Sequence, residues 1–179
     1  MHRTAVMMPA LLVTLGSLAA QTRSKAAETG KPSIQVQSTL NQLMRGVLYP
    51  ASNVVFSAQI DDPAHAEPLP GQDPSMATDP TKSTFRGWDA IENAALALAE
   101  STNLLLIPGR SCSNGVPAPI ADPDWQRFVQ QLRDASMTAY QAARSKDLDK
   151  MVEVADTLTT ACAVCHRKWR EKRAADRCK

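Results

Sequence analysis

Apolar residues recur every three or four positions in four stretches of the chain, which is the spacing that one buried face of an α-helix produces. These stretches cover residues 33–60, 83–106, 122–145 and 148–173. No stretch shows the strict apolar–polar alternation of a half-buried strand. Four amphipathic helices joined by polar connections predict an all-α fold, an antiparallel four-helix bundle.

Prolines and acidic residues mark the expected ends of these helices. Pro50 interrupts the first stretch and predicts a kink or a break there. Residues 61–82 contain five prolines, which exclude a regular helix and predict a linker between the first and second helices. Asp122 followed by Pro123, and later Asp147, are typical helix-start signals, so they predict where the last two helices begin.

The N-terminus has the pattern of a secretory signal peptide. His2 and Arg3 precede the uncharged apolar run 5–20, which is shorter than the roughly 20 residues that cross a bilayer. An uncleaved membrane anchor is the alternative. We therefore divide the chain into a signal peptide (1–19), a disordered segment (20–32) and one helical domain (33–179), and we expect export to the periplasm.

Charge and hydropathy narrow the classes of partner. With 20 basic and 18 acidic residues the formal net charge is +2, which argues against a nucleic-acid binder. Beyond the N-terminus no apolar run approaches spanning length, so we expect no membrane association of the mature chain.

Four cysteines occur, and two of them form the motif Cys162-Ala163-Val164-Cys165-His166 on the last predicted helix. Cysteines three apart on a helix differ by about 60° in direction and one turn in height, and His166 projects from the same side. This spacing suits two thioether bonds to the vinyl groups of one haem, with His166 as the proximal iron ligand. The motif therefore predicts one covalent haem c.

Two other interpretations of the motif compete. A thioredoxin-like thiol pair needs a βαβ context and a helix start, and a zinc site needs further ligands. The remaining cysteines, Cys112 and Cys178, could pair in an oxidising compartment, or could stay unpaired.

The motif and the residues after it, Arg167-Lys168-Trp169-Arg170, resemble the ending of the class II c-type cytochromes, the cytochrome c-prime-like family. The resemblance covers roughly residues 33–173 and is strong only at the motif. It implies a helical bundle with haem attached on the C-terminal helix, acting as an electron carrier rather than an enzyme. By family position it implies a propionate contact for Arg170.

The resemblance also places the distal face of the haem against the first helix, where Met44 is the candidate iron ligand. Met44 as sixth ligand implies electron transfer with a redox partner protein. Met44 as an ordinary core residue implies the alternative, a five-coordinate haem protein that binds a small gas such as NO or CO. Members of the family often dimerise, so a homodimer is one option. The basic residues of 167–179 form either a docking patch for that partner or a cationic helix end.

Overall fold

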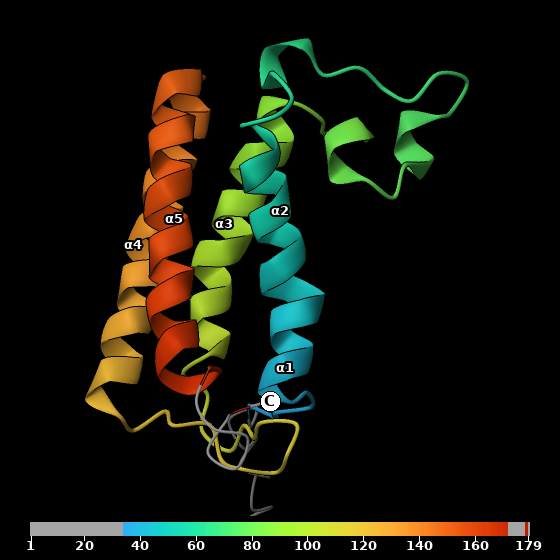
Figure 1. The fold of residues 1–179 in the computed structure, drawn as a ribbon. Helices are drawn as coiled ribbons and strands as arrows, with labels where there is room; N and C mark the ends of the chain where they lie inside the picture. The colour runs from blue at the N-terminus through green and yellow to red at the C-terminus, as the bar shows by residue number, and fades with distance from the viewer. Residues whose placement is uncertain (1–33, 172–177, 179) are drawn as a thin grey trace, which may run out of the picture. The chain divides into compact units, whose positions relative to one another are not determined.

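The computed structural model describes residues 34–171 and residue 178 (Figure 1). The predicted signal peptide (1–19) and disordered segment (20–32) lie outside the described residues. Within the described part every regular element is helical, and β pairing is limited to an isolated bridge between Ser111 and Pro117. The prediction of an all-α protein with four helices is confirmed.

The first helical segment consists of α1 (Leu40–Leu43), the π-helical turn η1 (Met44–Leu48) and α2 (Tyr49–Ser57). It starts later than predicted because a capping box fixes its first turn: Gln42 N–H donates to Thr39 Oγ1 at 3.3 Å, and Thr39 N–H donates to Gln42 Oε1 at 2.9 Å. Ile34, which falls in the predicted stretch 33–60, precedes the helix and is 77% exposed.

Of the two alternatives predicted at Pro50, a kink or a break, the break does not occur, because the helical segment continues through the proline. Pro50 has no N–H to donate to the carbonyl four residues earlier, and the hydrogen-bond pattern changes just before it. Tyr49 N–H donates to the Met44 carbonyl, five residues back, which is the π-helical pattern. The disturbance from Pro50 therefore falls on the turn that begins with Met44.

The linker contains three short 3-10 turns, η2 (Pro63–His65), η3 (Pro74–Met76) and η4 (Pro80–Lys82). Each follows an aspartate whose carboxylate accepts the N–H two residues further on, at 2.9 Å in all three. The prediction that this segment holds no regular α-helix is confirmed.

Helix α3 (Trp88–Leu104) starts five residues later than predicted because Gly87 ends the linker with a φ of +66°. A Cβ at this position would lie 2.6 Å from the Pro63 carbonyl oxygen, so only glycine allows the linker to pack so closely. Phe85, which falls in the predicted stretch 83–106, lies before the helix and is 63% exposed.

Helices α4 (Pro123–Ser145) and α5 (Leu148–Trp169) begin where their sequence signals predict. Asp122 accepts the Asp124 N–H at 2.8 Å, and Asp147 accepts the Lys150 N–H at 3.0 Å. Between them Lys146 adopts the left-handed conformation, with a φ of 54°, so the chain reverses within a few residues.

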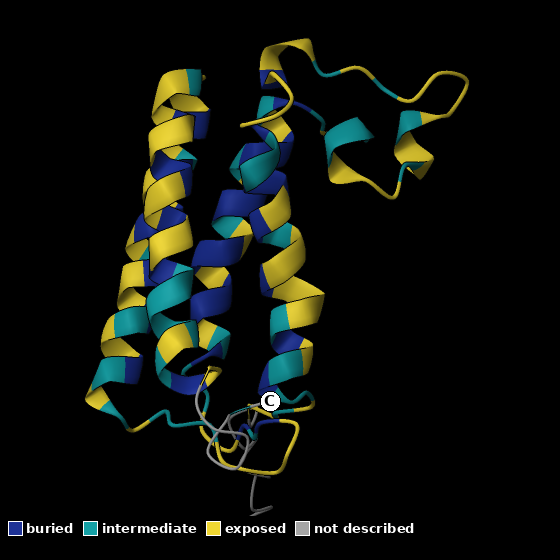
Figure 2. Cartoon of the chain, viewed as in Figure 1, coloured by how far each residue is buried: buried dark blue, intermediate teal, exposed yellow. Residues whose placement is uncertain are grey.

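The helices pack in sequence: α2 against α3, α3 against α4, and α4 against α5. Figure 1 shows the chain direction alternating from one to the next, in agreement with the predicted antiparallel bundle. The buried residues line the inner faces (Figure 2), and many are alanines, which allow α3 and α4 to approach closely. In the described part of the chain, no comparably close packing joins α5 to α1, η1 or α2.

Candidate cofactor-attachment site

Cys162, Cys165 and His166 lie in the last two turns of α5, well inside the helix rather than at its start. Their helical spacing places Cys165 about 60° to one side of Cys162 and His166 about 40° to the other, so the three side chains share an arc of about 100° around the helix axis. Both thiols are free, half-buried and packed against the main hydrophobic core. The structure therefore brings together the three residues of the motif.

The electrostatics of the two thiols keep them uncharged. Burial raises the pKa of Cys162, and burial together with the neighbouring Cys162 raises the pKa of Cys165 to about 12. A thioredoxin-like pair needs a thiol whose pKa is lowered, commonly at a helix N-terminus. The site has neither property, so the geometry disfavours that interpretation.

The His166 imidazole is also held neutral. Burial lowers the pKa of His166, and the nearby Arg170 guanidinium lowers it further. The backbone carbonyl of His166 accepts the N–H groups of Arg170 and Glu171, at 2.8 and 3.0 Å. A neutral imidazole on a well-formed helix end is the state in which histidine binds iron.

Trp169 holds this end of α5 against α4. It is 7% exposed, and its ring makes edge contacts with Trp125 at 5.0 Å and with Phe128 at 5.6 Å between ring centroids. Lys168 adds an ion pair to the carboxylates of Asp122 (3.2 Å) and Asp124 (2.6 Å). Trp125 is 1% exposed and is a core residue of this aromatic cluster.

Met44, the candidate distal ligand, is the first residue of the π-helical turn η1. Its side chain is half-buried and packs against the same hydrophobic core as the two thiols of the motif. Helix α3 contacts η1, whereas α5 does not pack closely against it within the described residues. π-Helical turns inside α-helices occur frequently at functional sites.

Arg170 is exposed and forms an ion pair with Glu171 at 3.3 Å, on the side of α5 near His166. The propionate contact stays a prediction. Among the described basic residues after the motif, Lys168 is already paired with α4, so Arg167 and Arg170 remain as exposed cations.

Cys112 and Cys178 form a disulfide, with their Cα atoms 5.0 Å apart. This separation is ordinary for a disulfide. Because Cys112 and Cys178 pair with each other, only Cys162 and Cys165 are free thiols, and haem attachment needs two free thiols.

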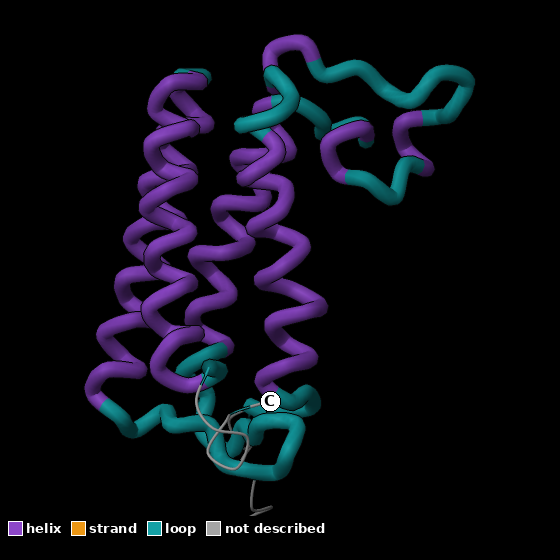
Figure 3. Tube along the Cα trace, viewed as in Figure 1, coloured by secondary structure: helices purple, strands orange, loops and turns teal. Residues whose placement is uncertain are grey.

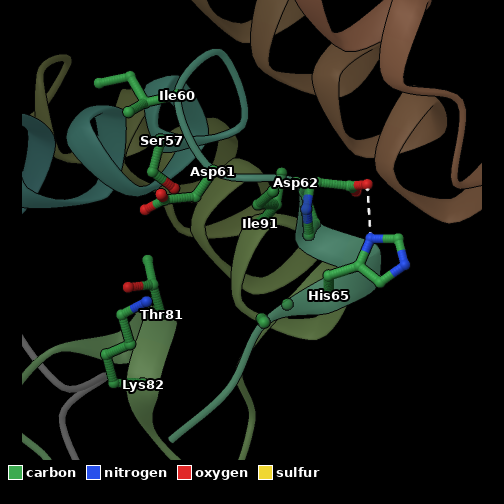
Figure 4. A pocket seen from close by; sticks show the side chains of 11 residues that line it. Ser57, Ile60, Asp61, Asp62, His65, Thr81, Lys82 and Ile91 are labelled. Carbon is green, nitrogen blue, oxygen red and sulfur yellow. Dashed lines mark hydrogen bonds and ion pairs between the residues drawn. The ribbon is translucent and has the colours of Figure 1, made fainter. Parts of the chain in front are cut away.

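The polar cavity shown in Figure 4 lies away from the motif. It has a volume of about 220 Å³ and is lined by residues of α2, the linker and the start of α3, among them Asp61, Lys82 and Ile91. His65 at its edge is paired with Asp62, Nδ1 to Oδ2 at 2.8 Å, and its side chain is 84% exposed. His65 is therefore a solvated side chain of the linker.

Within residues 34–171 and 178, no three His, Cys, Asp or Glu side chains converge as a metal site, which is what the zinc interpretation would need. None of the helices in this part combines the length and apolarity needed to cross a bilayer.

Compared with models of protein families, with curated proteins and with solved structures, the chain matches none.

Sequence reasoning did not predict the π-helical turn or the buried Arg110 in the loop between α3 and α4. Arg110 is 5% exposed. Its sequence signal was a single cation two residues before Cys112, in a segment otherwise rich in proline, serine and glycine.

Proposed function

We propose that this chain is an exported, periplasmic monohaem c-type cytochrome of the class II type that transfers electrons to or from a redox partner protein. Cys162 and Cys165 hold the haem, and His166 is the proximal iron ligand. The observation that carries the proposal is the placement of two free thiols and a neutral imidazole on one side of α5, while the other two cysteines pair with each other.

The donor set fits a covalently attached haem. Each thiol adds its S–H across one vinyl group, so that a carbon–sulfur bond forms, the hydrogen goes to carbon and no oxidant is consumed. The haem iron then supplies one-electron chemistry between its ferric and ferrous states. Because the thioethers and His166 come from adjacent turns of one helix, attachment and proximal ligation are set by the same local structure.

The surroundings of the motif support a role in electron transfer rather than substrate turnover. Both thiols pack against the hydrophobic core cluster, which would keep water away from that side of a bound haem. Within the described residues α5 does not pack closely against α1, η1 or α2, so a haem carried by α5 would reach the first helical segment without displacing a tight helix–helix contact.

Met44 is the sixth ligand in this proposal. Its thioether sulfur stabilises ferrous iron and raises the reduction potential. Its half-buried position in a π-helical turn supports this role over that of a fully buried core residue. Arg170, exposed beside His166, is the residue proposed to contact a haem propionate. A homodimer is compatible with this role.

The test is the optical spectrum of purified holoprotein, oxidised and reduced, together with acid–acetone extraction. Haem that stays with the polypeptide after extraction supports attachment through Cys162 and Cys165, and haem that is removed overturns it. A low-spin reduced spectrum supports Met44 as ligand. A high-spin spectrum with rapid carbon monoxide binding would instead establish the five-coordinate, gas-binding alternative.

A further inference from the structure

Three segments distant in sequence meet at one end of the helices. They are the residues just before α1, the loop between α3 and α4, and the C-terminal end of α5 (Figure 3). Leu40 N–H donates to the Ser111 carbonyl at 2.8 Å, so the first residue of α1 is bonded to the loop. The loop is itself closed by the bridge between Ser111 and Pro117.

Arg110 strengthens the link between this loop and α1. Its Nη1 donates to the Ser38 carbonyl at 2.7 Å and to the Ser38 hydroxyl at 2.9 Å. Its Nε donates to the Leu104 carbonyl at 3.2 Å, at the end of α3. A buried guanidinium with these partners orients three backbone segments at once, because its donors are arranged in a rigid fork.

The Cys112–Cys178 disulfide links the same loop to the end of α5. Cys178 N–H donates to the Trp169 carbonyl at 3.1 Å, so the disulfide is attached to the last residue of the helix. Cys112 is 1% exposed, which makes the bond part of the interior of this end.

Both links end within about one helical turn of the candidate iron ligands. Leu40 is four residues before Met44, about 6 Å along the helix axis, and Trp169 is three residues after His166, about 4.5 Å. In the described part of the chain, α5 does not pack closely against the α1–η1 segment that carries Met44. The distance between α5 and this segment at this end is therefore fixed through the loop between α3 and α4.

We propose that Arg110 and the Cys112–Cys178 disulfide form a positioning clamp that holds the helix of Met44 at ligand distance from the haem carried by α5. The inference rests on the proposed function. It makes sixth-ligand occupancy dependent on a disulfide that is chemically distinct from the thioethers, since reduction by a dithiol opens the first and leaves the second intact.

The experiment compares three variants with wild-type holoprotein: C112S/C178S, R110K and the control R133K. Arg133 also ties two elements, donating to Thr102 Oγ1 and Asn103 Oδ1 at 2.8 Å each, but it joins α4 to α3 and not the two ligand-bearing helices. Covalent haem content, the reduced spectrum and the rate of carbon monoxide binding to the ferrous protein are measured.

We expect C112S/C178S, and wild type treated with dithiothreitol, to keep covalent haem but to bind carbon monoxide about 10–100-fold faster, by analogy with the losses of metal affinity or activity that follow removal of groups orienting a metal ligand. R110K, which keeps the charge but not the fork, gives a smaller increase, and R133K gives none. In a Met44→Ala background the effect of removing the disulfide disappears, because the two changes act on the same ligand.

Carbon monoxide binding by C112S/C178S and R110K at the rate of R133K overturns the clamp while leaving haem attachment standing. A high-spin wild type also overturns the clamp, because no sixth ligand would then need positioning. Haem that is extractable from the wild type overturns the proposed function itself. The experiment therefore distinguishes failure of the clamp from failure of the proposed function.

Discussion

The helix that carries Cys162 and His166 and the helical segment that carries Met44 have the same apolar periodicity but are built differently. Helix α5 is regular over its whole length, capped by Asp147 and held to α4 by an aromatic cluster at its end. The segment α1–η1–α2 contains a π-helical turn, packs mainly against α3, and exposes Val47 and Tyr49.

This contrast shows two ways of placing a side chain. The positions of Cys162, Cys165 and His166 relative to one another follow from helix geometry alone, so local sequence sets them. The position of Met44 relative to them depends on Pro50, on the loop between α3 and α4 and on the disulfide, so tertiary structure sets it. Changes on α5 should affect attachment, and changes on the first segment should affect ligation.

The largest expected effect is on attachment itself. C162S/C165S removes both sulfurs and should abolish haem that survives denaturing electrophoresis. Met44→Ala should keep this haem and convert a low-spin reduced spectrum to high-spin. Met137→Ala, at an exposed methionine of α4, is the control and should leave both measurements unchanged. Retention of covalent haem by C162S/C165S would refute the assignment of the motif.

Trp169→Ala should destabilise the protein by about 3–5 kcal/mol, because it empties a buried aromatic site between α4 and α5. Urea unfolding followed by circular dichroism measures the free energy of unfolding. Trp88→Ala, at the half-buried start of α3, is the comparison and should cost less. Equal decreases in the free energy of unfolding for the two variants would mean that Trp169 stabilises the end of α5 no more than Trp88 stabilises the start of α3.

Pro50→Ala tests whether the proline produces the π-helical turn. Restoring the N–H of residue 50 allows a regular helix, and removing a π-turn rotates Met44 by about 100° relative to α2. We expect loss of the low-spin spectrum with a stability change of about 1 kcal/mol or less, since the π-helical turn already accommodates the missing N–H of Pro50.

Gly46→Ala is the matched control for Pro50→Ala. A Cβ at Gly46 meets nothing within 4 Å, so this variant should gain about 0.5–1 kcal/mol without a spectral change. An unchanged spectrum in Pro50→Ala would show that the turn is set by packing against α3 instead.

The smallest expected effect concerns acid pH. The backbone N–H of Asp124 and the Lys168 ammonium lower the pKa of Asp122, and hydrogen bonds from Lys168 and Arg127 lower the pKa of Asp124. Their stabilising contribution is therefore complete above about pH 4, the range of an unfolded aspartate, and is lost as pH falls through the lowered values. Lys168→Met should make the urea midpoint less dependent on pH between neutrality and about pH 3. An identical pH profile would contradict this.

The predictable parts of the fold are those with local signals. The starts of α4 and α5 follow from Asp122 with Pro123 and from Asp147, whose caps need no tertiary contact. The start of α3 was misplaced because the positive φ of Gly87 depends on the close approach of Pro63, 24 residues earlier in the printed sequence. An apolar residue in a predicted helix is not always buried, since Val152 of α5 is 46% exposed.

In the candidate site, too, the features set by local sequence were predictable and those set by tertiary contacts were not. The spacing of the motif predicted that its three residues share one side of a helix, and the structure has them so. The disulfide was one of two open alternatives, because residues 112 and 178 meet only through the folding of α4 and α5. The haem and its sixth ligand stay predictions that the spectrum tests.

The disulfide also has a topological consequence. It joins residues 66 apart and so closes a covalent ring that contains all of α4, all of α5 and the haem motif, while α1, η1, α2 and α3 form a linear arm outside it. Closing a ring of this size stabilises the fold by about 4 kcal/mol, mainly by restricting the unfolded chain. Within the arm, α3 packs closely against α4 of the ring, whereas α1, η1 and α2 pack closely only against α3 and one another in the described part of the chain. In amide hydrogen exchange the segment α1–η1–α2 should therefore open before α3, α4 and α5. The segment that bears Met44 then detaches and returns while the ring that bears His166 stays closed.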